Sequence, residues 1–416
     1  MTAVGIERLP AKRMRTGELA TAGAIATKLA AGNVAPIVLT GRPSSRVNAV
    51  AAAIAVAEGA AGHAASLDHD GAFPADDIAA LRAHGLLAAP VPVAFGGTGL
   101  GTSPEGALPM LQVFRRIGHA SLPLGRLYEG HVNALKLVFR YGGQAQQALF
   151  AREAQAGRLF GVWNTEFGDG VRLADQADGR RQLDGSKVYA SGAGYVERPL
   201  ITARLADGSV QMVVPLLAAG ERADLSGWVA HGMRASATGT LDFTGIEVDD
   251  SELIGAPGDY LLQPTFSSGA WRFAAVHLGG IERLLDELRR HLQRTRRDAD
   301  PYQLARVGQA AMAAETANLW LERACRLAED PETDPDTAMA FVNLTRLAVE
   351  RAALDVLELT QRSIGLAGHL RSHPVERLSR DLATYLRQPA PDRALAQAAA
   401  HVLSSPVPAV ELWGST

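Results

Sequence analysis

Residues 380–395, RDLATYLRQPAPDRAL, hold the groups whose chemistry first raises a question about function. The segment has a carboxylate at Asp381, a phenol at Tyr385 and no second carboxylate before Asp392. Asp381 directly follows Arg380, so its first interpretation is an ion pair rather than a base. A phenol with an ordinary pKa of about 10 can donate a hydrogen bond but is a poor base near neutral pH. Tyr385 is therefore a candidate donor, and an ordinary core tyrosine is the competing interpretation.

His131 is the histidine of greatest interest, because histidine changes charge close to neutral pH. It lies in LGRLYEGHVNAL, which has the periodicity of a helix. A histidine next to a helical glycine is more often a packed or capping residue than a catalytic one, and both interpretations stay open. His369 and His373 have the helical spacing of a metal pair, but Gly368 and Pro374 flank them and no third ligand is evident. We expect no metal site.

The composition indicates a large, mainly helical protein. Of 416 residues, 47% are hydrophobic and 20% are charged, and 41 basic against 44 acidic side chains give a formal net charge of -3. A chain of this length is expected to form two or three modules. No basic stripe with interleaved aromatic residues indicates nucleic acid, and no apolar stretch is long enough to span a membrane. The single cysteine, Cys325, has no disulfide partner, which favours a reducing cytoplasm.

The expected fold is mainly α-helical with a central β module. Residues 1–45 are expected to form a loosely ordered arm. Helical periodicity over residues 46–157 predicts an N-terminal helical domain, and short β-rich runs between turn signals over residues 158–258 predict an antiparallel β domain. Long helical segments then predict a C-terminal four-helix bundle over residues 259–405.

Several strings in this order and spacing resemble the acyl-CoA dehydrogenase family. They are LRAHGLLAAPVPVAFGGTGL, GVWNTEFGDG, LDGSKVYASGAGYVERPLITAR, HGMRASATGTLDFTGIEVDDSELIG, YQLARVGQAAMAA and ELTQRSIGLAGHLRSHPVERLSRD. The likeness covers residues 46–395. It implies a flavoprotein in which FAD lies between the β domain and the bundle, and in which a neighbouring subunit of a dimer or tetramer contacts the adenine and pyrophosphate end.

The resemblance also implies two groups of flavin contacts. Contacts to the flavin ring would come from Trp163, Thr165, Tyr189 and Ser191. Family members more often carry Trp and Thr at the last two places, and the replacements keep an aromatic face and a hydroxyl. Contacts to the dinucleotide part would come from Arg296 (or Arg297), Gln303, Gln361 and Gly365. The Arg-x-x-Phe-Gly turn of the family is shorter here, reads RTRRDADP and lacks the Phe.

Acyl thioester dehydrogenation needs a base that removes the α proton, and this chain lacks the family's Glu at both of its usual places. One place is occupied by Pro389 and the other by Trp271, directly ahead of Arg272. The TEPGAGSD loop of the family reads TEFGDGVR, so Val171 replaces a serine associated with the CoA ester, while Arg172 could attract a phosphate. Val171, Arg172, Trp271 and Arg272 are therefore the candidate substrate contacts.

Three functions remain open after these departures. The leading hypothesis is FAD-dependent α,β-dehydrogenation of an acyl thioester with a non-standard base, with a flavoprotein or oxygen as electron acceptor. The second is the related branch of monooxygenases, which uses free reduced flavin and oxygen with histidines near the flavin; His131 and Tyr385 would occupy those places. The third is a catalytically idle homologue that binds flavin or an acyl thioester without turnover.

Overall fold

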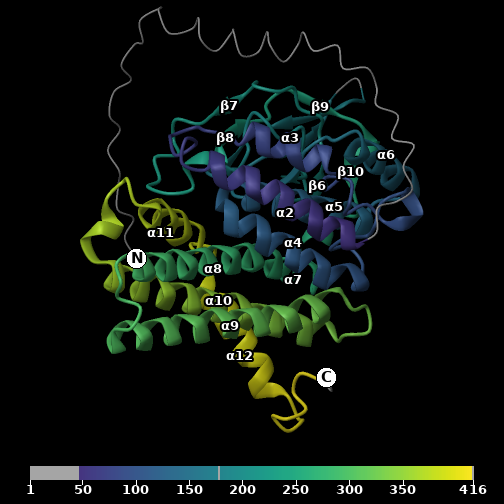
Figure 1. The fold of residues 1–416 in the computed structure, drawn as a ribbon. Helices are drawn as coiled ribbons and strands as arrows, with labels where there is room; N and C mark the ends of the chain where they lie inside the picture. The colour runs from purple at the N-terminus through teal and green to yellow at the C-terminus, as the bar shows by residue number, and fades with distance from the viewer. Residues whose placement is uncertain (1–45, 177–178, 415–416) are drawn as a thin grey trace, which may run out of the picture. The chain divides into compact units, whose positions relative to one another are not determined.

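A computed structural model describes residues 46–176 and 179–414. The arm expected at residues 1–45 lies outside the described residues. From residue 46 onward, helices come first, strands follow and long helices close the chain, which is the predicted order (Figure 1). The mainly helical fold with a central sheet is therefore confirmed.

The N-terminal helices form one wall of the candidate active site that is described below. They are α2 (Arg46–His63), α3 (Ala75–Ala83), α4 (Ala107–Ala120), α5 (Leu122–Tyr141) and α6 (Gln144–Gln155). The side chain of Ser121 caps α5 by accepting a hydrogen bond from the N–H of Leu124 at 3.3 Å, and Pro123 fits the first turn because it needs no amide partner there. Two glycines follow helix ends: Gly85 comes after α3 with a φ of 73°, and Gly142 follows α5 directly.

The β domain consists of two sheets. Its strands are β1 (Phe160–Trp163), β2 (Arg172–Asp175), β3 (Arg181–Asp184), β4 (Ser186–Ala190), β5 (Arg198–Arg204), β6 (Val210–Val213), β7 (Ala223–Asp224), β8 (Gly239–Asp242), β9 (Ile246–Val248) and β10 (Leu253–Ile254). The larger sheet has the order β10-β6-β5-β2-β3-β9 with β1 paired to β5, and the smaller has the order β4-β8-β7. Most pairs are antiparallel, as predicted, but β1 and β2 run parallel to β5.

One predicted run of strand is divided in the structure. The segment TLDFTGIEV alternates in polarity and reads as a single strand, yet its two halves are β8 and β9 and belong to different sheets. Gly245, with a φ of 83°, ends the extended conformation between them. The apolar positions change phase at this turn, from Leu241 and Phe243 before Gly245 to Ile246 and Val248 after it, so a single strand could not keep all four on one face.

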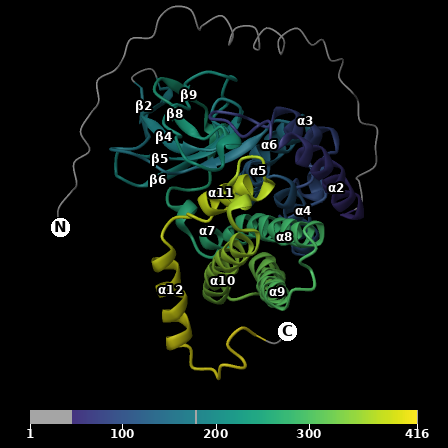
Figure 2. The same ribbon diagram turned by 60° about the vertical axis from the view of Figure 1, so that its left-hand side comes forward.

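The C-terminal helices include the three longest of the described residues, α8, α9 and α10. They are α7 (Thr265–Ser268), α8 (Ala270–Arg294), α9 (Pro301–Glu329), α10 (Pro335–Ile364), α11 (Pro374–Tyr385) and α12 (Pro391–Ser404). The side chain of Asp334 caps α10 by accepting from the N–H of Thr337 at 2.8 Å, as the DPETDPD turn predicts. Both ribbon views show α8, α9 and α10 side by side (Figures 1 and 2). No helix among the described residues is long and apolar enough to cross a membrane.

Two glycines bring the N-terminal helices close to α8. A Cβ atom added at Gly118 of α4 would lie 2.3 Å from the carbonyl oxygen of Val276, and one added at Gly125 of α5 would lie 2.4 Å from its Cγ1. Larger residues would force the helices apart. The close approach places the first turns of α8 beside α5, where the polar cluster described below is formed.

The short helix α11 lies between the β domain and α8 (Figure 2). A Cβ atom at Gly232 would lie 2.1 Å from the carbonyl oxygen of Arg380, so only glycine allows this contact. The N–H of Met233 donates to Oδ1 of Asp381 at 2.6 Å. The ion-pair partner of Asp381 is Arg377, one turn earlier in α11, rather than the adjacent Arg380 considered from the sequence.

Candidate active site

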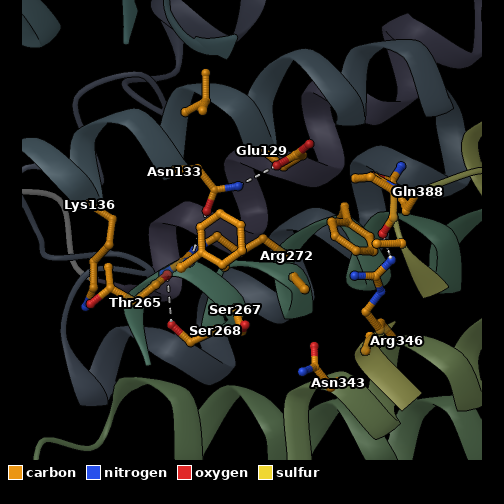
Figure 3. Close-up of a pocket in the computed structure, with 18 of the residues that line it drawn as sticks. Glu129, Asn133, Lys136, Thr265, Ser267, Ser268, Arg272, Asn343, Arg346 and Gln388 are labelled. Atoms are coloured by element: carbon orange, nitrogen blue, oxygen red, sulfur yellow. Dashed lines mark hydrogen bonds between the residues drawn. The ribbon is translucent and has the colours of Figure 1, made fainter. Parts of the chain in front are cut away.

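A cavity of about 340 Å³ opens between α5, the start of α8, α10 and the segment that joins α11 to α12 (Figure 3). Residues of α5 form one wall, including Arg126, Glu129 and Asn133. Arg272 and Phe273 approach from α8. The lining combines apolar side chains, among them Leu137 and Phe266, with polar ones such as those labelled in Figure 3, a mixture that suits a small-molecule site.

Glu129 is at the centre of a hydrogen-bond network on this wall. Its side chain is only 2% exposed and forms an ion pair with Arg126, one turn earlier in α5. Nδ2 of Asn133 donates to Oε2 of Glu129 at 2.6 Å, and the Asn133 carbonyl oxygen accepts from Arg272 at 3.1 Å. Figure 3 shows Asn133 between Glu129 and Arg272. The spacing of Arg126, Glu129 and Asn133 by three and four residues places all three on one helix face.

Tyr385, a predicted catalytic residue, lies at the end of this network. Its hydroxyl donates to Oε1 of Glu129 at 3.4 Å, and its ring meets the ring of His277 edge-on at 4.5 Å. Burial raises the pKa of Tyr385 well above its ordinary value, and the negative charge of Glu129 adds to the effect. Burial lowers the pKa of His277 to about 3. Near neutral pH the phenol is therefore protonated and the imidazole is neutral, so this pair can donate or orient but does not exchange charge.

The predicted contacts of the flavin ring are brought together next to the network. The indole N–H of Trp163 donates to the carbonyl oxygen of Ser191 at 2.9 Å. The hydroxyl of Ser191 accepts from Nε of Arg126 at 3.3 Å. Since Arg126 also pairs with Glu129, an unbroken chain of polar contacts joins the β domain to Tyr385.

Thr165 and Tyr189 lie on adjoining segments of the β domain. The carbonyl oxygen of Thr165 accepts from the N–H of Val188 at 3.0 Å. Tyr189 has a left-handed φ of 53°, is 55% exposed and meets the ring of Trp228 edge-on. A bulky residue in this conformation carries backbone strain, which is typical of functional sites.

His131, the other predicted catalytic residue, does not line the cavity. It is fully buried, and its two ring nitrogens contact backbone groups: Nε2 lies 2.8 Å from the carbonyl oxygen of Leu87, and Nδ1 accepts from the N–H of Phe160 at 3.1 Å. Burial lowers the pKa of His131 to about 4. With both nitrogens occupied and no cavity access, His131 joins α5 to β1 as a structural residue, and we give it no part in the chemistry proposed below.

Of the four candidate substrate contacts, Arg272 alone lines the cavity. Trp271 is fully buried, and its indole N–H donates to Oε1 of Glu329 at 3.1 Å. Arg272 and Lys136 form ion pairs with the same buried carboxylate. Glu329 thus anchors the start of α8 and the end of α5 to the end of α9.

Val171 and Arg172, at the start of β2, do not line the cavity. Val171 is fully buried and its N–H contacts the carboxylate of Glu166 at 3.5 Å. Arg172 is exposed and pairs with Asp169 at 3.4 Å. Arg172 lines a separate hollow formed by β2, β3, β5 and β6. Neither residue reaches the cavity.

The predicted contacts of the dinucleotide part form a second group at the other end of α8. Arg296 follows the last turn of α8 with a left-handed φ of 55°, and Gly365 follows α10 with a φ of 73°. Gln361 is in the last turn of α10. Gln303 is buried, and its amide, oriented to satisfy its hydrogen bonds, donates to Oγ of Ser363 at 3.0 Å. From His277 to the end of α8 is about 25 Å along the helix at 1.5 Å per residue, so one subunit keeps the two groups well apart.

The sequence identified some members of the network and missed others. Arg126, Asn133 and Glu329 were not singled out, and Glu129 was only one of several carboxylates that a fold could bring near a flavin. The i, i+3 and i+7 spacing of Arg126, Glu129 and Asn133 was an available signal. Nothing local marks Glu329, because its partners lie in other helices. Among the described residues, no group of three or more His, Cys, Asp or Glu side chains is placed to hold a metal ion.

Two family models match the chain. The acyl-CoA dehydrogenase N-terminal domain matches residues 46–158, and the acyl-CoA dehydrogenase C-terminal domain matches residues 258–386. Together they cover more than half of the sequence. The chain therefore belongs to the acyl-CoA dehydrogenase family.

Among individual relatives, the chain is similar to a dibenzothiophene monooxygenase of Rhodococcus erythropolis, with 26% identity over 365 residues, 79% of this chain and 86% of the relative. It is 27% identical over 342 residues to the amino sugar nitrososynthase DnmZ of Streptomyces peucetius, which covers 76% of this chain and 82% of the relative. It is 25% identical over 336 residues to SfnC of Pseudomonas putida, described as a probable FMNH2-dependent monooxygenase, which covers 73% of this chain and 82% of the relative.

Solved structures establish the fold, but they do not distinguish between the activities known for proteins of this fold. FMN-bound TdsC from Paenibacillus sp. A11-2 superposes with a TM-score of 0.75 at 20% identity, covering 88% of this chain and 100% of that chain. The butyryl-CoA dehydrogenase of Megasphaera elsdenii also gives a TM-score of 0.75, at 17% identity, covering 86% and 98%. A monooxygenase branch and a dehydrogenase thus fit equally well, and the choice between them depends on the site.

Proposed function

We propose that this protein is a flavin-dependent monooxygenase that receives reduced flavin from a separate reductase. The observation that carries the proposal is the state of Glu129, the only carboxylate among the described residues that line the cavity. Arg126, Asn133 and Tyr385 all donate to it. To accept a substrate proton, Glu129 would have to give up its ion pair with Arg126, which is costly for a buried pair. The residue is better suited to orienting neighbours than to removing an α proton.

The residues of the β domain fit a flavin ring. Both amide atoms of Asn164 are buried without a hydrogen bond of good geometry, although the hydroxyl of Tyr260 approaches this side chain. Buried amides normally satisfy both groups, so Asn164 has hydrogen-bonding capacity to spare. Asn164 lies between Trp163 and Thr165, in the segment where the family resemblance predicts the edge of the ring. Tyr189 offers an exposed aromatic face on the adjoining segment. An amide with hydrogen-bonding capacity to spare beside an aromatic face is the combination that a planar heterocycle with donors and acceptors at its edge would complete.

A bound reduced flavin supplies the two electrons with which one atom of O2 enters the substrate and the other leaves as water. Tyr385 does not line the cavity; its hydroxyl, held in the protonated form, donates to Glu129, which does line it. Glu129 accepts from Tyr385 and Arg126 and so fixes the positions of both. His277 packs its neutral ring against Tyr385 and limits the rotation of the phenol. The rest of the buried wall excludes water from the reacting atoms.

The cofactor could be FAD, as the resemblance implies, or FMN, as the description of the Pseudomonas putida relative implies for that protein. Trp163, Thr165, Tyr189 and Ser191 would contact the part that both flavins share. Only FAD would also need Arg296, after the end of α8, and Gln361 and Gly365, at the end of α10. The end of α8 is about 25 Å along the helix from His277. We infer that FAD binding requires a second subunit, in a dimer or tetramer, to supply this group.

The two other hypotheses have less support. Acyl thioester dehydrogenation, the leading hypothesis from the sequence, would need a base where the chain has Pro389 and Trp271, and Val171 does not reach the cavity. A relocated base at Glu129 is the remaining route to that reaction. A catalytically idle homologue would have no need for the polar network between Ser191 and Tyr385.

Two assays on the full chain separate these functions. In the first, the protein is supplied with FMN or FAD, a flavin reductase, NADH and air, and tested with aromatic sulfur compounds and amines for products heavier by one oxygen atom. Oxygenated product that requires the protein and the reductase supports the proposal. In the second, oxidised flavin is bound without oxygen and acyl-CoA thioesters are added. Loss of the visible flavin band on thioester addition would overturn the proposal in favour of dehydrogenation with Glu129 as base.

A further inference from the structure

The cavity has an excess of positive charge that its own residues do not balance. Five cationic side chains line it against a single carboxylate. They are Arg126, Lys136, Arg272, Arg346 and Arg393, and the carboxylate is Glu129. Arg126 is paired with Glu129, and the buried carboxylate of Glu329 serves both Lys136 and Arg272. Two cations are left over.

Arg346 of α10 is the more informative of these two. Within residues 46–176 and 179–414 it forms no ion pair; its one hydrogen bond goes from Nη2 to the carbonyl oxygen of Pro389 at 2.7 Å. The guanidinium also lies 5.6 Å from the ring centroid of Phe273. Burial lowers the pKa of Arg346. The negative charge of Glu350 acts in the opposite direction but is the smaller effect, and the Glu350 carboxylate already accepts a hydrogen bond from Arg387. Half-buried cations are normally paired, because desolvation without compensation is costly.

Arg393, the second unpaired cation, is on the first turn of α12 and contributes to the same cavity. It is exposed and makes no ion pair within the described ranges. Neutral donors accompany the two arginines, among them Asn343, Gln388 and Gln397. In Figure 3, Arg346 and Gln388 lie at the opposite end of the cavity from Lys136. Two unpaired guanidinium groups beside amide donors form a surface suited to oxyanions, which bind Arg in bidentate geometry.

We propose that the substrate carries an anionic group, a carboxylate, sulfonate or phosphate, which binds between Arg346 and Arg393 while the reacting atom faces the wall of the cavity at Glu129. This inference rests on the proposed function in one respect, namely that the cavity is the substrate site. The anion would supply the charge that the described residues do not, and it would hold the substrate in one orientation. A neutral hydrocarbon or thioester chain has no group that would use these two arginines.

The experiment measures binding without turnover. Isothermal titration at fixed ionic strength compares benzenesulfonate with methyl phenyl sulfone, a neutral molecule of similar shape, on the wild-type protein and three variants. Arg346→Gln and Arg393→Gln each remove one cation of the site, and the first keeps an amide donor for Pro389. Arg387→Gln is the matched control, because it removes an exposed cation of the same segment that pairs with Glu350 outside the cavity.

We expect the wild-type protein and Arg387→Gln to bind the sulfonate about tenfold or more tightly than the sulfone, the worth of one charge-assisted contact. Arg346→Gln is expected to abolish this preference and Arg393→Gln to reduce it. Equal affinities for the two probes, no binding of either, or a preference that survives both substitutions overturns the proposal. If Arg346→Gln fails to fold, the comparison of Arg393→Gln with the wild type decides, because Arg393 is exposed and its replacement should not disturb folding. Because no flavin or oxygen is needed, a negative oxygenation assay with a positive titration would refute the monooxygenase and leave the anion site standing.

Discussion

The hydroxyl of Tyr385 reaches Oε1 of Glu129 at 3.4 Å across 256 residues of chain, from α11 to α5. Neither residue alone indicates a site. Together with Arg126 and Ser191 they connect the predicted flavin-ring contacts of the β domain to the wall of the cavity. The connection explains how a chain without the family's usual Glu can retain a structured polar site at the same place.

Tyr385→Phe tests the donor role of the phenol. The variant keeps the ring against His277 and loses only the hydroxyl, so we expect turnover in the oxygenation assay to fall about a hundredfold, the lower range for a positioned proton donor. Stability should change by only about 1 kcal/mol, because a single long hydrogen bond is lost. The control is Tyr128→Phe, which removes another buried hydroxyl, bonded to the carbonyl oxygen of Leu86 away from the cavity. A similar loss of turnover in both variants would mean that the effect is structural.

Much of the fold could be predicted because it depends on local signals. Ser121, Asp334, Gly85 and Gly142 mark helix boundaries by capping and turn chemistry that act over a few residues. The phase of the alternation in TLDFTGIEV changes at Gly245, which marks a break, but the two sheets that its halves join could not be predicted. Pairing with distant strands decides which sheet each half joins.

The site was predictable only where the family resemblance supplied positions. Trp163 and Ser191 were predicted and lie in contact. His131 had the residue type of a catalyst, but its environment, two backbone partners and complete burial, is set by β1 and by the loop at Leu87. Arg346 has an ordinary helical context, and its lack of a partner becomes visible only when α10 and the segment at Pro389 are placed together.

Glu329→Gln tests the buried carboxylate that holds α5, α8 and α9 together. Removing its charge leaves Lys136 and Arg272 without their anion, so we expect a loss of about 3–5 kcal/mol in the free energy of unfolding. Thermal unfolding measured by circular dichroism provides the readout. Glu332→Gln, an exposed carboxylate in the following turn, is the control and should leave the melting temperature nearly unchanged. A stable Glu329→Gln variant would show that the cluster tolerates an unbalanced cation.

His131 leads to a prediction about acid stability. Its folded-state pKa is about 4, below the ordinary value of about 6.5 in an unfolded chain. Between these two values the unfolded state binds the proton and the folded state does not, so stability is lost as the pH falls below about 6.5. One such histidine contributes a slope of up to about 1.4 kcal/mol per pH unit. His131→Gln should therefore give a shallower decline in melting temperature between pH 6.5 and 4.5 than the wild type.

His84→Gln serves as the control for that comparison, because His84 is exposed after the end of α3. Its decline with pH should match the wild type. Carboxylates also titrate in this pH range, but they are the same in the wild type and both variants. Only the difference between the slopes of melting temperature against pH therefore reports on His131. An unchanged slope in His131→Gln would show that the buried imidazole does not titrate with unfolding.

Arg296→Gln tests which flavin the second group of residues serves. Arg296 is exposed just after the end of α8 and belongs to the group proposed to contact the dinucleotide part of FAD. Losing one charge-assisted phosphate contact should weaken FAD about tenfold while leaving FMN affinity unchanged. Fluorescence titration with each flavin measures both constants on the same protein. The control Arg289→Gln removes an exposed cation of α8 that pairs with Asp286. If Arg296→Gln weakens the binding of FAD and of FMN equally, Arg296 does not belong to a dinucleotide site. FMN would then make every contact that Trp163, Tyr189 and Ser191 offer to a flavin.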